Sequence, residues 1–238
     1  MTRIGFSTGA LAYADFAEGL RMSRGKGFDA IELSALRASE VDPLLDALET
    51  LDLREYAYIS FHAPSKFEER DEPAIASRLF ERLPSHWPVV LHPDASSDLA
   101  LWAPFGERLL IENMDKRKAG ARTRSELQRV FEALPAAGFC FDIGHARQVD
   151  PTMIEARWLL EAFADRLREI HISEVNTASN HYRLSYGVNL AFKEVADLIP
   201  PDVAVILETP VTEAEMLQQA AMALEALGLH APALSEVA

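Results

Sequence analysis

The stretch FCFDIGHA, residues 139–146, places an acid and an imidazole at the end of an apolar run. Residues 139–141 are of the kind that predicts a strand buried on both faces, as in a parallel sheet. Asp142 and His145 stand where this strand would leave the core. Both are potential ligands, so the meaning of the stretch depends on whether other strands end in the same way.

Apolar, β-rich runs of similar length recur along the chain. There are eight of them: RIGFST (3–8), FDAIELS (28–34), YAYISFHA (56–63), WPVVLHP (87–93), RLLIENM (108–114), FCFDIGH (139–145), LREIHIS (167–173) and VAVILETP (203–210). Most are nearly continuous in apolar character, which indicates parallel strands covered on both faces.

Amphipathic segments with helical periodicity separate the runs. The last segment is the best marked, because Thr212 and Glu215 form a capping-box pattern and Gly228 suits a helix C-cap. Thr123 and Glu126 form a second capping-box pattern. The expected helical segments are 11–24, 40–50, 68–83, 123–134, 151–166, 190–198 and 212–227, whereas 94–106 is expected to hold only a turn or two.

An eightfold alternation of strand and helix predicts a closed (β/α)8 TIM barrel, an α/β fold. An open, doubly wound sheet is the alternative, but STGALA after the first run lacks the G-x-G-x-x-G phosphate loop. No linker or low-complexity segment divides the chain. Residues 1–238 are therefore expected to form one domain, with 229–238 as a loose C-terminal tail.

The composition limits the classes of partner. Of the 238 residues, 49% are apolar, and the formal net charge is −14. This charge would repel a polyanion on average, so no nucleic-acid partner is expected. No apolar run approaches the ~20 residues of a membrane span, and no membrane partner is expected.

The location is expected to be cytoplasmic. The lone Cys140 cannot form an intrachain disulfide, which agrees with a reducing compartment. The sequence AYA at 12–14 imitates a signal-peptidase site, but glycine, serine and threonine dilute the apolar part before it. A first strand and loop are therefore preferred to a signal peptide.

Six consecutive runs, the third to the eighth, end in a ligand-type side chain. In a parallel barrel these ends meet at one rim, which carries the active site. Carboxylates packed into an apolar mouth would raise one another's pKa, and a divalent cation such as Mn, Mg, Co or Zn removes that conflict. Each residue alone is equally well explained as a core hydrogen-bonding group or a helix cap, so the coincidence carries the prediction of a metal site. The residues are His62, His92, Glu112, Asp142 with His145, His171 and Glu208.

The chain resembles the xylose isomerase-like TIM barrel superfamily, which holds sugar isomerases, sugar epimerases, inosose dehydratases and endonuclease IV-type apurinic endonucleases. Six motifs carry the resemblance: SFHAP (60–64), VLHP (90–93), IEN (111–113), FDIGH (141–145), IHIS (170–173) and LET (207–209). The epimerase branch implies one metal held by Glu112, Asp142, His171 and Glu208. It also implies that Glu112 and Glu208 act as acid and base, and that His145 binds substrate.

The endonuclease branch implies additional metal ligands at His62 and His92. A third metal of that branch uses the D-x-x-H histidine and a D-x-H motif after the seventh strand. His181 matches the histidine of the second motif, but Ser179 stands where the aspartate belongs. The first run has FST where that branch has H-x-S, so the match to the endonucleases is incomplete.

Basic residues near the expected rim are candidates for binding an anionic group of the substrate. Lys116 opens the segment KRKAGARTR (116–124), and Arg183 lies in the loop after the seventh strand, close to His181, which is also a candidate for binding substrate. The segment could hold a phosphate or an acidic sugar, although a solvated loop explains it at least as well.

The predicted activity is that of a divalent-metal-dependent isomerase or epimerase of carbohydrate metabolism. It would act on a sugar or a related small molecule by proton transfer between Glu112 and Glu208. A metal-dependent phosphodiesterase and a non-catalytic ligand-binding barrel are the alternatives. The substrate, the metal and the oligomeric state stay open, a homo-oligomer included.

Overall fold

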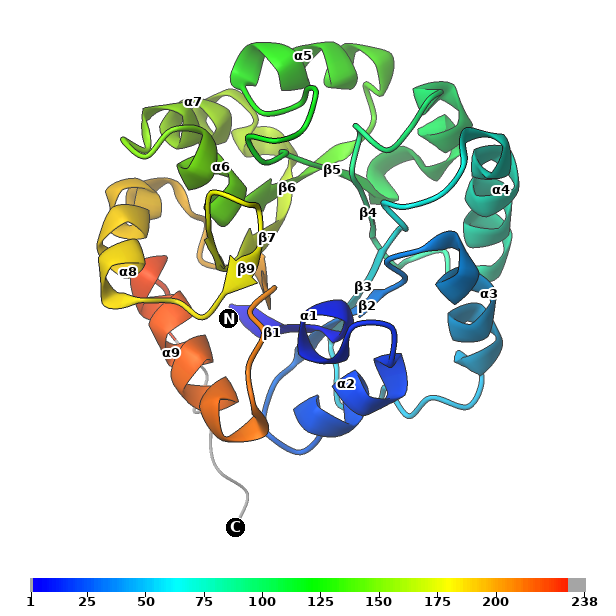
Figure 1. The fold of residues 1–238 in the computed structure, drawn as a ribbon, viewed down its shortest axis with the longest axis horizontal. Helices are drawn as coiled ribbons and strands as arrows, with labels where there is room; N and C mark the ends of the chain where they lie inside the picture. The colour runs from blue at the N-terminus through cyan, green and yellow to red at the C-terminus, as the bar shows by residue number, and fades with distance from the viewer. Residues whose placement is uncertain (1, 231–238) are drawn as a thin grey trace.

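Eight parallel strands close into a barrel in the computed structural model, which describes residues 2–230. Figure 1 looks along the barrel and shows the strands at the centre of a ring of helices. The prediction of a (β/α)8 TIM barrel is therefore confirmed. The barrel strands are β1 (Arg3–Ser7), β2 (Ala30–Ser34), β3 (Tyr58–His62), β4 (Val89–Leu91), β5 (Leu109–Glu112), β6 (Gly138–Asp142), β7 (Leu167–Ile172) and β10 (Ala204–Leu207).

The helices cover the outside of the barrel, as their amphipathic patterns predict. The capping box of Thr212 and Glu215 is present, and Gly228 takes a positive φ of 66° after the last helix. The α-helices are α1 (Thr8–Ala12), α2 (Phe16–Ser23), α3 (Ala38–Ala47), α4 (Glu72–Arg82), α5 (Arg124–Ala133), α6 (Ile143–Val149), α7 (Ile154–Ala162), α8 (Tyr186–Phe192) and α9 (Met216–Ala226). The 3-10 segments are η1 (Glu69–Asp71), η2 (Leu99–Arg108), η3 (Ala164–Arg166), η4 (Lys193–Leu198) and η5 (Glu213–Glu215).

The structure differs from the predicted elements at the first helix and after the sixth barrel strand. The expected helix 11–24 is two helices, because Tyr13 takes a φ of 53° and ends α1. The strand expected at 139–141 is present as β6, and Asp142 at its end caps α6, a helix that the sequence did not predict, by accepting a 2.6 Å hydrogen bond from the His145 backbone N–H. His145 therefore lies in the first turn of this helix.

The main core fills the space between the strands and the helices. Inside the barrel, by contrast, Val90, Leu110 and Cys140 form only a small separate apolar cluster. Leu110 shares a strand face with Glu112, since successive side chains alternate between the two faces of a strand. Above this thin apolar layer, buried polar and charged side chains occupy the interior, which is costly unless they are paired or bind an ion.

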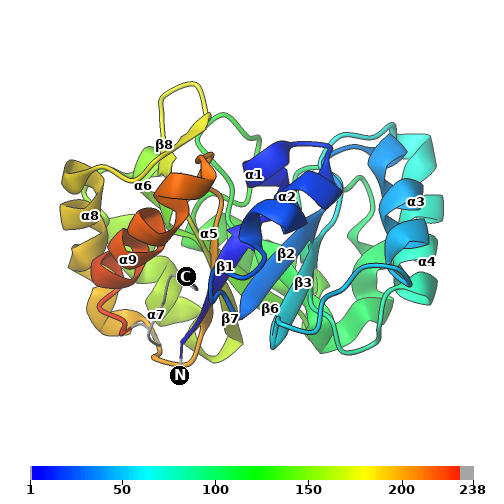
Figure 2. The same ribbon diagram turned by 90° about the horizontal axis from the view of Figure 1, so that it is seen from below.

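A short antiparallel hairpin projects over one end of the barrel (Figure 2). Its strands are β8 (Glu174–Val175) and β9 (His181–Tyr182), and it lies in the loop between β7 and α8. The N-terminal end of β1 is at the opposite end of the barrel (Figure 2). The hairpin thus partly covers the rim formed by the carboxyl ends of the strands.

The first residue of the predicted tail, Leu229, is described by the structure. Leu229 is 8% exposed and packs into the main core. Its backbone N–H donates a hydrogen bond to the carbonyl oxygen of Leu224 in α9, which holds it against the end of that helix. The rest of the predicted tail, residues 231–238, lies outside the described residues. Among the described residues, no helix has the length and apolar character needed to cross a membrane.

Candidate metal centre at the carboxyl rim

The four predicted metal ligands meet at the carboxyl rim of the barrel. Glu112 and Asp142 are the last residues of β5 and β6, His171 is the penultimate residue of β7, and Glu208 directly follows β10. One potential ligand atom of each residue lies within 4.8 Å of the others. Parallel pairing produces this convergence, since Asp142 and His171 are register partners on neighbouring strands.

Several of these ligand atoms lack a hydrogen-bond partner among the described residues. They are Glu112 Oε1, Asp142 Oδ2 and His171 Nδ1, and all three are buried. A buried polar atom without a partner costs about 1–3 kcal/mol, so three in one cluster call for a ligand. Oxygen and imidazole donors in this number fit a divalent cation such as Mn, Co, Mg or Zn. The residues present therefore fit the metal that the strand-end pattern predicts.

The electrostatics of the cluster also favour a cation. Burial, reinforced by the neighbouring carboxylates of Glu112 and Glu208, raises the pKa of Asp142 to about 7. Burial acts in the same direction on Glu112, but the surrounding imidazoles outweigh it and hold the pKa of Glu112 well below its usual range. Positive charge is thus what stabilises the ionised form of these carboxyl groups.

A second group of potential ligands shares Glu112 with the first. The Oε2 atom of Glu112 lies 3.3 Å from His62 Nε2 and 3.0 Å from His92 Nε2. The Nδ1 atom of His62 is 2.8 Å from the Ala63 carbonyl oxygen, so Nε2 is the ring nitrogen that faces Glu112 and could ligate a cation. Burial lowers the pKa of His62, but Glu32 and Glu112 outweigh it and raise that pKa to about 9.

The two histidines predicted to bind substrate lie beside the four ligands. His145 Nδ1 is 3.2 Å from Glu112 Oε1 and 3.5 Å from Asp142 Oδ2. His181, on the hairpin, is 3.6 Å from Glu208 Oε2 through its Nδ1 atom. The rings of His145 and His181 are 5.4 Å apart at an angle of 75°. Both imidazoles therefore adjoin carboxylates of the cluster, and their role in binding substrate stays a prediction.

Ser179, which stands in the hairpin where the endonuclease motif has an aspartate, forms hydrogen bonds within the protein. Ser179 donates a hydrogen bond of 2.5 Å to Asp115 and accepts one of 3.0 Å from Gln148. These contacts anchor the hairpin to the segment after β5. Ser179 thus acts here as a hydrogen-bonding residue of the loop.

The predicted anion-binding residues are less well placed. Arg183 is exposed and forms an ion pair with Glu215, at the start of α9. Lys116 is exposed, and within the basic segment Lys118 pairs with Asp94 at 2.9 Å and Arg122 with Glu126 at 2.7 Å. These pairs favour the interpretation of 116–124 as a solvated loop, and anion binding by Lys116 or Arg183 stays a prediction.

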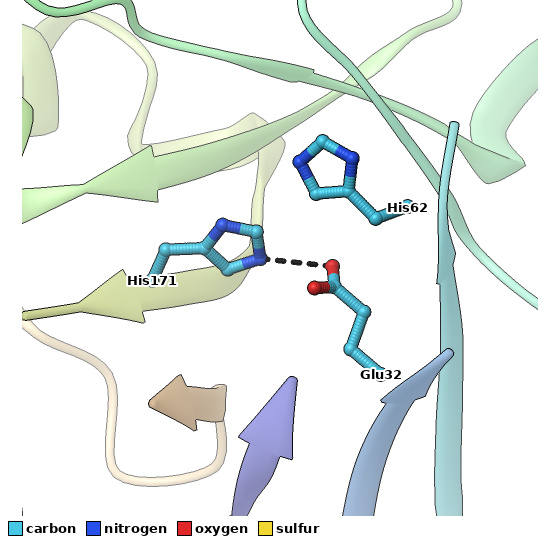
Figure 3. Close-up of side chains that lie close together, drawn as sticks. All are labelled: Glu32, His62 and His171. Atoms are coloured by element: carbon cyan, nitrogen blue, oxygen red, sulfur yellow. Dashed lines mark ion pairs between the residues drawn. The ribbon is translucent and has the colours of Figure 1, made fainter. Parts of the chain in front are cut away.

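Two fully buried glutamates belong to the site and escaped the sequence-based prediction. Glu32 of β2 and Glu169 of β7 are both 0% exposed and both approach His171. Figure 3 shows the contact of Glu32 with His171. The signal for Glu32 was the acid in FDAIELS, an acidic residue inside an otherwise apolar strand. Glu169 could have been found from its two-residue spacing to His171, which places both side chains inside the barrel.

A cavity of about 580 Å³ opens over the rim. Its lining includes Glu208, His181, Tyr13, Tyr182 and Lys66. A larger cavity of about 650 Å³ lies at the other end of the barrel and is lined by none of the candidate ligands. The rim cavity is therefore the one that adjoins the candidate metal centre.

The sequence and the fold were compared with known proteins. The structure of endonuclease IV from Thermus thermophilus aligns over 94% of this chain and 99% of its own, with 20% identity and a TM-score of 0.59. The structure of 3-keto-D-glucoside 4-epimerase from E. coli aligns over 95% and 99%, with 12% identity and a TM-score of 0.56. That of D-allulose 3-epimerase from Methylomonas sp. aligns over 95% and 96%, with 16% identity and a TM-score of 0.54.

At these identities the solved structures support the fold alone. A search of curated protein sequences gives no match. The sequence profile of the family described as xylose isomerase-like TIM barrel, however, matches residues 97–228, more than half of the chain. That segment contains all four residues of the rim cluster. With the closed barrel and the family profile in agreement, the chain belongs to the xylose isomerase-like TIM barrel family.

Proposed function

We propose that this protein is a divalent-metal-dependent isomerase or epimerase that acts on a sugar or a related keto or polyol compound. The observation that carries the proposal is the convergence of Glu112, Asp142, His171 and Glu208 at the rim, with their ligand atoms within 4.8 Å of one another. Two of the similar structures are, by their names, sugar epimerases, which supports the same class of reaction.

The two glutamates suit proton transfer next to a carbonyl group. A bound divalent cation would polarise the carbonyl and stabilise negative charge on the substrate oxygens. One glutamate, as the carboxylate, takes the proton from the carbon next to the carbonyl, and the other, as the acid, returns a proton to that carbon or its neighbour. The number of protons is conserved, so the product is an isomer of the substrate. Glu112 and Glu208 occupy the two sides of the cluster, on β5 and after β10.

The cavity above the cluster fits a small polar molecule. The hydroxyl of Ser7, the amide of Asn180 and the ring of His181 can hydrogen-bond to hydroxyl groups, and Tyr13 and Tyr182 offer flat apolar faces. Among the described residues of this lining, Lys66 is the one basic side chain other than histidine, whereas a nucleic-acid groove usually carries many. The net charge of −14 also disfavours a nucleic-acid substrate.

A metal-dependent phosphodiesterase is the second candidate. The specific observation in its favour is that His62 and His92 form a further group of potential ligands with Glu112, since two cations could then bind side by side. The replacement of the expected aspartate by Ser179 removes one ligand of a third cation. The acidic surface and the lining of the cavity make this the weaker candidate.

Metal content and solvent exchange test the proposal together. We expect purified protein, dialysed against Mn²⁺, Co²⁺ or Zn²⁺, to hold one strongly bound cation per chain. A panel of keto and aldo sugars in D₂O, followed by proton NMR, should then reveal a substrate whose hydrogen next to the carbonyl exchanges with solvent or moves between carbons. Two or more tight cations with hydrolysis of a phosphodiester would favour the second candidate, and no cation at all would favour a non-catalytic ligand-binding barrel.

A further inference from the structure

His171 contacts carboxylates with both of its ring nitrogens. Nδ1 faces the rim, 3.7 Å from both Glu112 and Glu208. Nε2 faces the interior of the barrel, 2.8 Å from Glu169 Oε1 and 3.1 Å from Glu32 Oε2 (Figure 3 shows the contact with Glu32). The proposed proton transfer uses neither Glu32 nor Glu169, so these two buried acids need an explanation.

Glu169 is held as a hydrogen-bond acceptor. Its Oε2 atom accepts a hydrogen bond of 2.6 Å from the Tyr58 hydroxyl, which reaches it from the opposite side of the barrel on β3. Its Oε1 atom is 2.8 Å from His171 Nε2. A carboxylate only accepts hydrogen bonds, so in this contact the N–H of His171 at Nε2 donates to Oε1.

Glu32 adds a second negative charge at the same nitrogen. Its Oε1 atom accepts a 3.4 Å hydrogen bond from Ser34, but Oε2 is buried without a hydrogen-bond partner among the described residues. One N–H group cannot be shared fully by two carboxylates, and Glu169 has the shorter contact. The position of Glu32 therefore makes sense as a counter-charge rather than as a hydrogen-bond partner.

We infer that Glu169 and Glu32 are positioning residues that keep the proton of His171 on Nε2 and its lone pair on Nδ1, directed at the rim. A metal-ligating imidazole commonly donates its other N–H to a carboxylate, which fixes the tautomer and makes the ligating nitrogen more basic. His171 has this arrangement with a carboxylate at 2.8 Å and a second at 3.1 Å. The inference rests on the metal site of the proposed function and extends it to a layer of residues below the rim.

Nitrogen NMR of the imidazole rings tests the tautomer directly. We expect His171, assigned by comparison with a His171→Asn variant, to carry a proton on Nε2 both without metal and with Zn²⁺, while Zn²⁺ shifts only its Nδ1 resonance. Zn²⁺ suits this measurement because it is diamagnetic and has no redox chemistry. An unprotonated Nε2 in the zinc-loaded protein would overturn the inference.

Metal affinity tests the consequence. Glu169→Gln and Glu32→Gln should weaken Zn²⁺ binding, measured by competition with a chromophoric chelator, and the loss for Glu169→Gln should reach about 10–100-fold. Glu72→Gln is the matched control, because Glu72 is equally buried but bonds to Ser96, Ser97 and Trp102 and belongs to neither group of candidate ligands. The Glu72→Gln variant should bind Zn²⁺ as tightly as the wild type does. Tyr58→Phe keeps both acids and should weaken Zn²⁺ binding less than Glu169→Gln does. It tests the same contact if the Glu169→Gln variant does not fold.

The outcomes separate the two proposals. If the wild type takes up Zn²⁺ and the Glu169, Glu32 and Tyr58 variants bind it as tightly, the positioning role is wrong and the metal site stands. If the wild type takes up no Zn²⁺, the metal site of the proposed function fails, and the positioning role fails with it. Weakened binding in the three variants, with the Glu72 control unchanged, would support both.

Discussion

Glu112 is the side chain on which the candidate site depends most. It lies 3.3 Å from His62, 3.0 Å from His92, 3.2 Å from His145 and 3.7 Å from His171. It belongs to the rim cluster and also to the second group of ligands. A single carboxylate thus joins both candidate cation positions, and its charge is the counterpart of most of the buried imidazoles.

The two glutamates should differ when each is changed to glutamine. Glutamine keeps the shape and one oxygen donor but cannot accept the proton at neutral pH, so each change should lower kcat by about 10²–10⁴-fold. Glu112→Gln should also lose metal, because it removes the charge shared by four imidazoles, whereas Glu208→Gln should keep more of it. Elemental analysis of each variant, alongside kinetics on the sugar found in the D₂O screen, separates the two effects. A metal-loaded Glu208→Gln variant with a near-normal rate would contradict the two-glutamate mechanism.

At the scale of elements, α4 is tied to the loop after β4 by one buried acid. Glu72 accepts hydrogen bonds from Ser96 Oγ at 2.5 Å, from Ser97 Oγ at 2.6 Å and from Trp102 Nε1 at 2.8 Å. Burial alone would raise the pKa of Glu72, but these hydrogen bonds outweigh it and lower that pKa. The network explains why the segment 94–106, with a weak helical pattern, still has a defined 3-10 structure at η2.

Replacing Glu72 should destabilise the fold in a pH-dependent way. Glu72→Ala leaves Trp102 Nε1 buried without an acceptor, so we expect a loss of about 1–3 kcal/mol in the free energy of unfolding at pH 7. Because the pKa in the folded state is the lower one, this stability is present above the pKa of the unfolded state and is lost as the pH falls through the folded pKa. Urea unfolding of wild type and variant at neutral and acidic pH should show the difference shrinking in acid. A difference that grows in acid would contradict the assignment.

At the scale of the whole molecule, the barrel holds many like charges together inside, and a cation should stabilise it. A ligand that binds only the folded state at about 100 times its Kd adds ~2.7 kcal/mol. For a chain of this size that corresponds to a rise in Tm of about 5–11 °C. Thermal unfolding with Mn²⁺ or Zn²⁺ and then with excess chelator should show this difference. The Glu72→Gln variant should show the same shift from a lower starting Tm, and no shift in either protein would argue against the metal centre.

The charge of the whole molecule leads to a prediction about nucleic acid. The net charge is −14, and several basic residues near the rim are paired with the protein's own acids, as Lys118 is with Asp94. We expect no appreciable binding to a duplex that contains an abasic site, at physiological salt, in a fluorescence anisotropy titration. Incision of that duplex by trace enzyme, abolished by a chelator, would place the phosphodiesterase ahead of the isomerase.

The eight barrel strands, and the acids and imidazoles at their ends, could be predicted from the sequence, whereas the hairpin β8–β9 was not predicted. Apolar runs and capping patterns are local signals, and in a parallel barrel every strand end reaches the same rim, so Glu112, Asp142, His171 and Glu208 could be predicted to meet. Short features were missed where local signals conflict. The helix α6 is one, since its cap, Asp142, also ends an apolar strand.

The residues below the rim could not be predicted from the sequence, because their contacts cross the barrel. Glu32 and His171 are on β2 and β7, which are separated in the barrel by β1 and β10. Their contact of 3.1 Å crosses the interior and depends on the closure and stagger of the strands, which no local pattern encodes. The same holds for Tyr58 and Glu169, 111 positions apart in the chain. The positions of the strand ends can be predicted because the apolar runs recur along the chain. Contacts across the barrel cannot, because they depend on how the sheet closes.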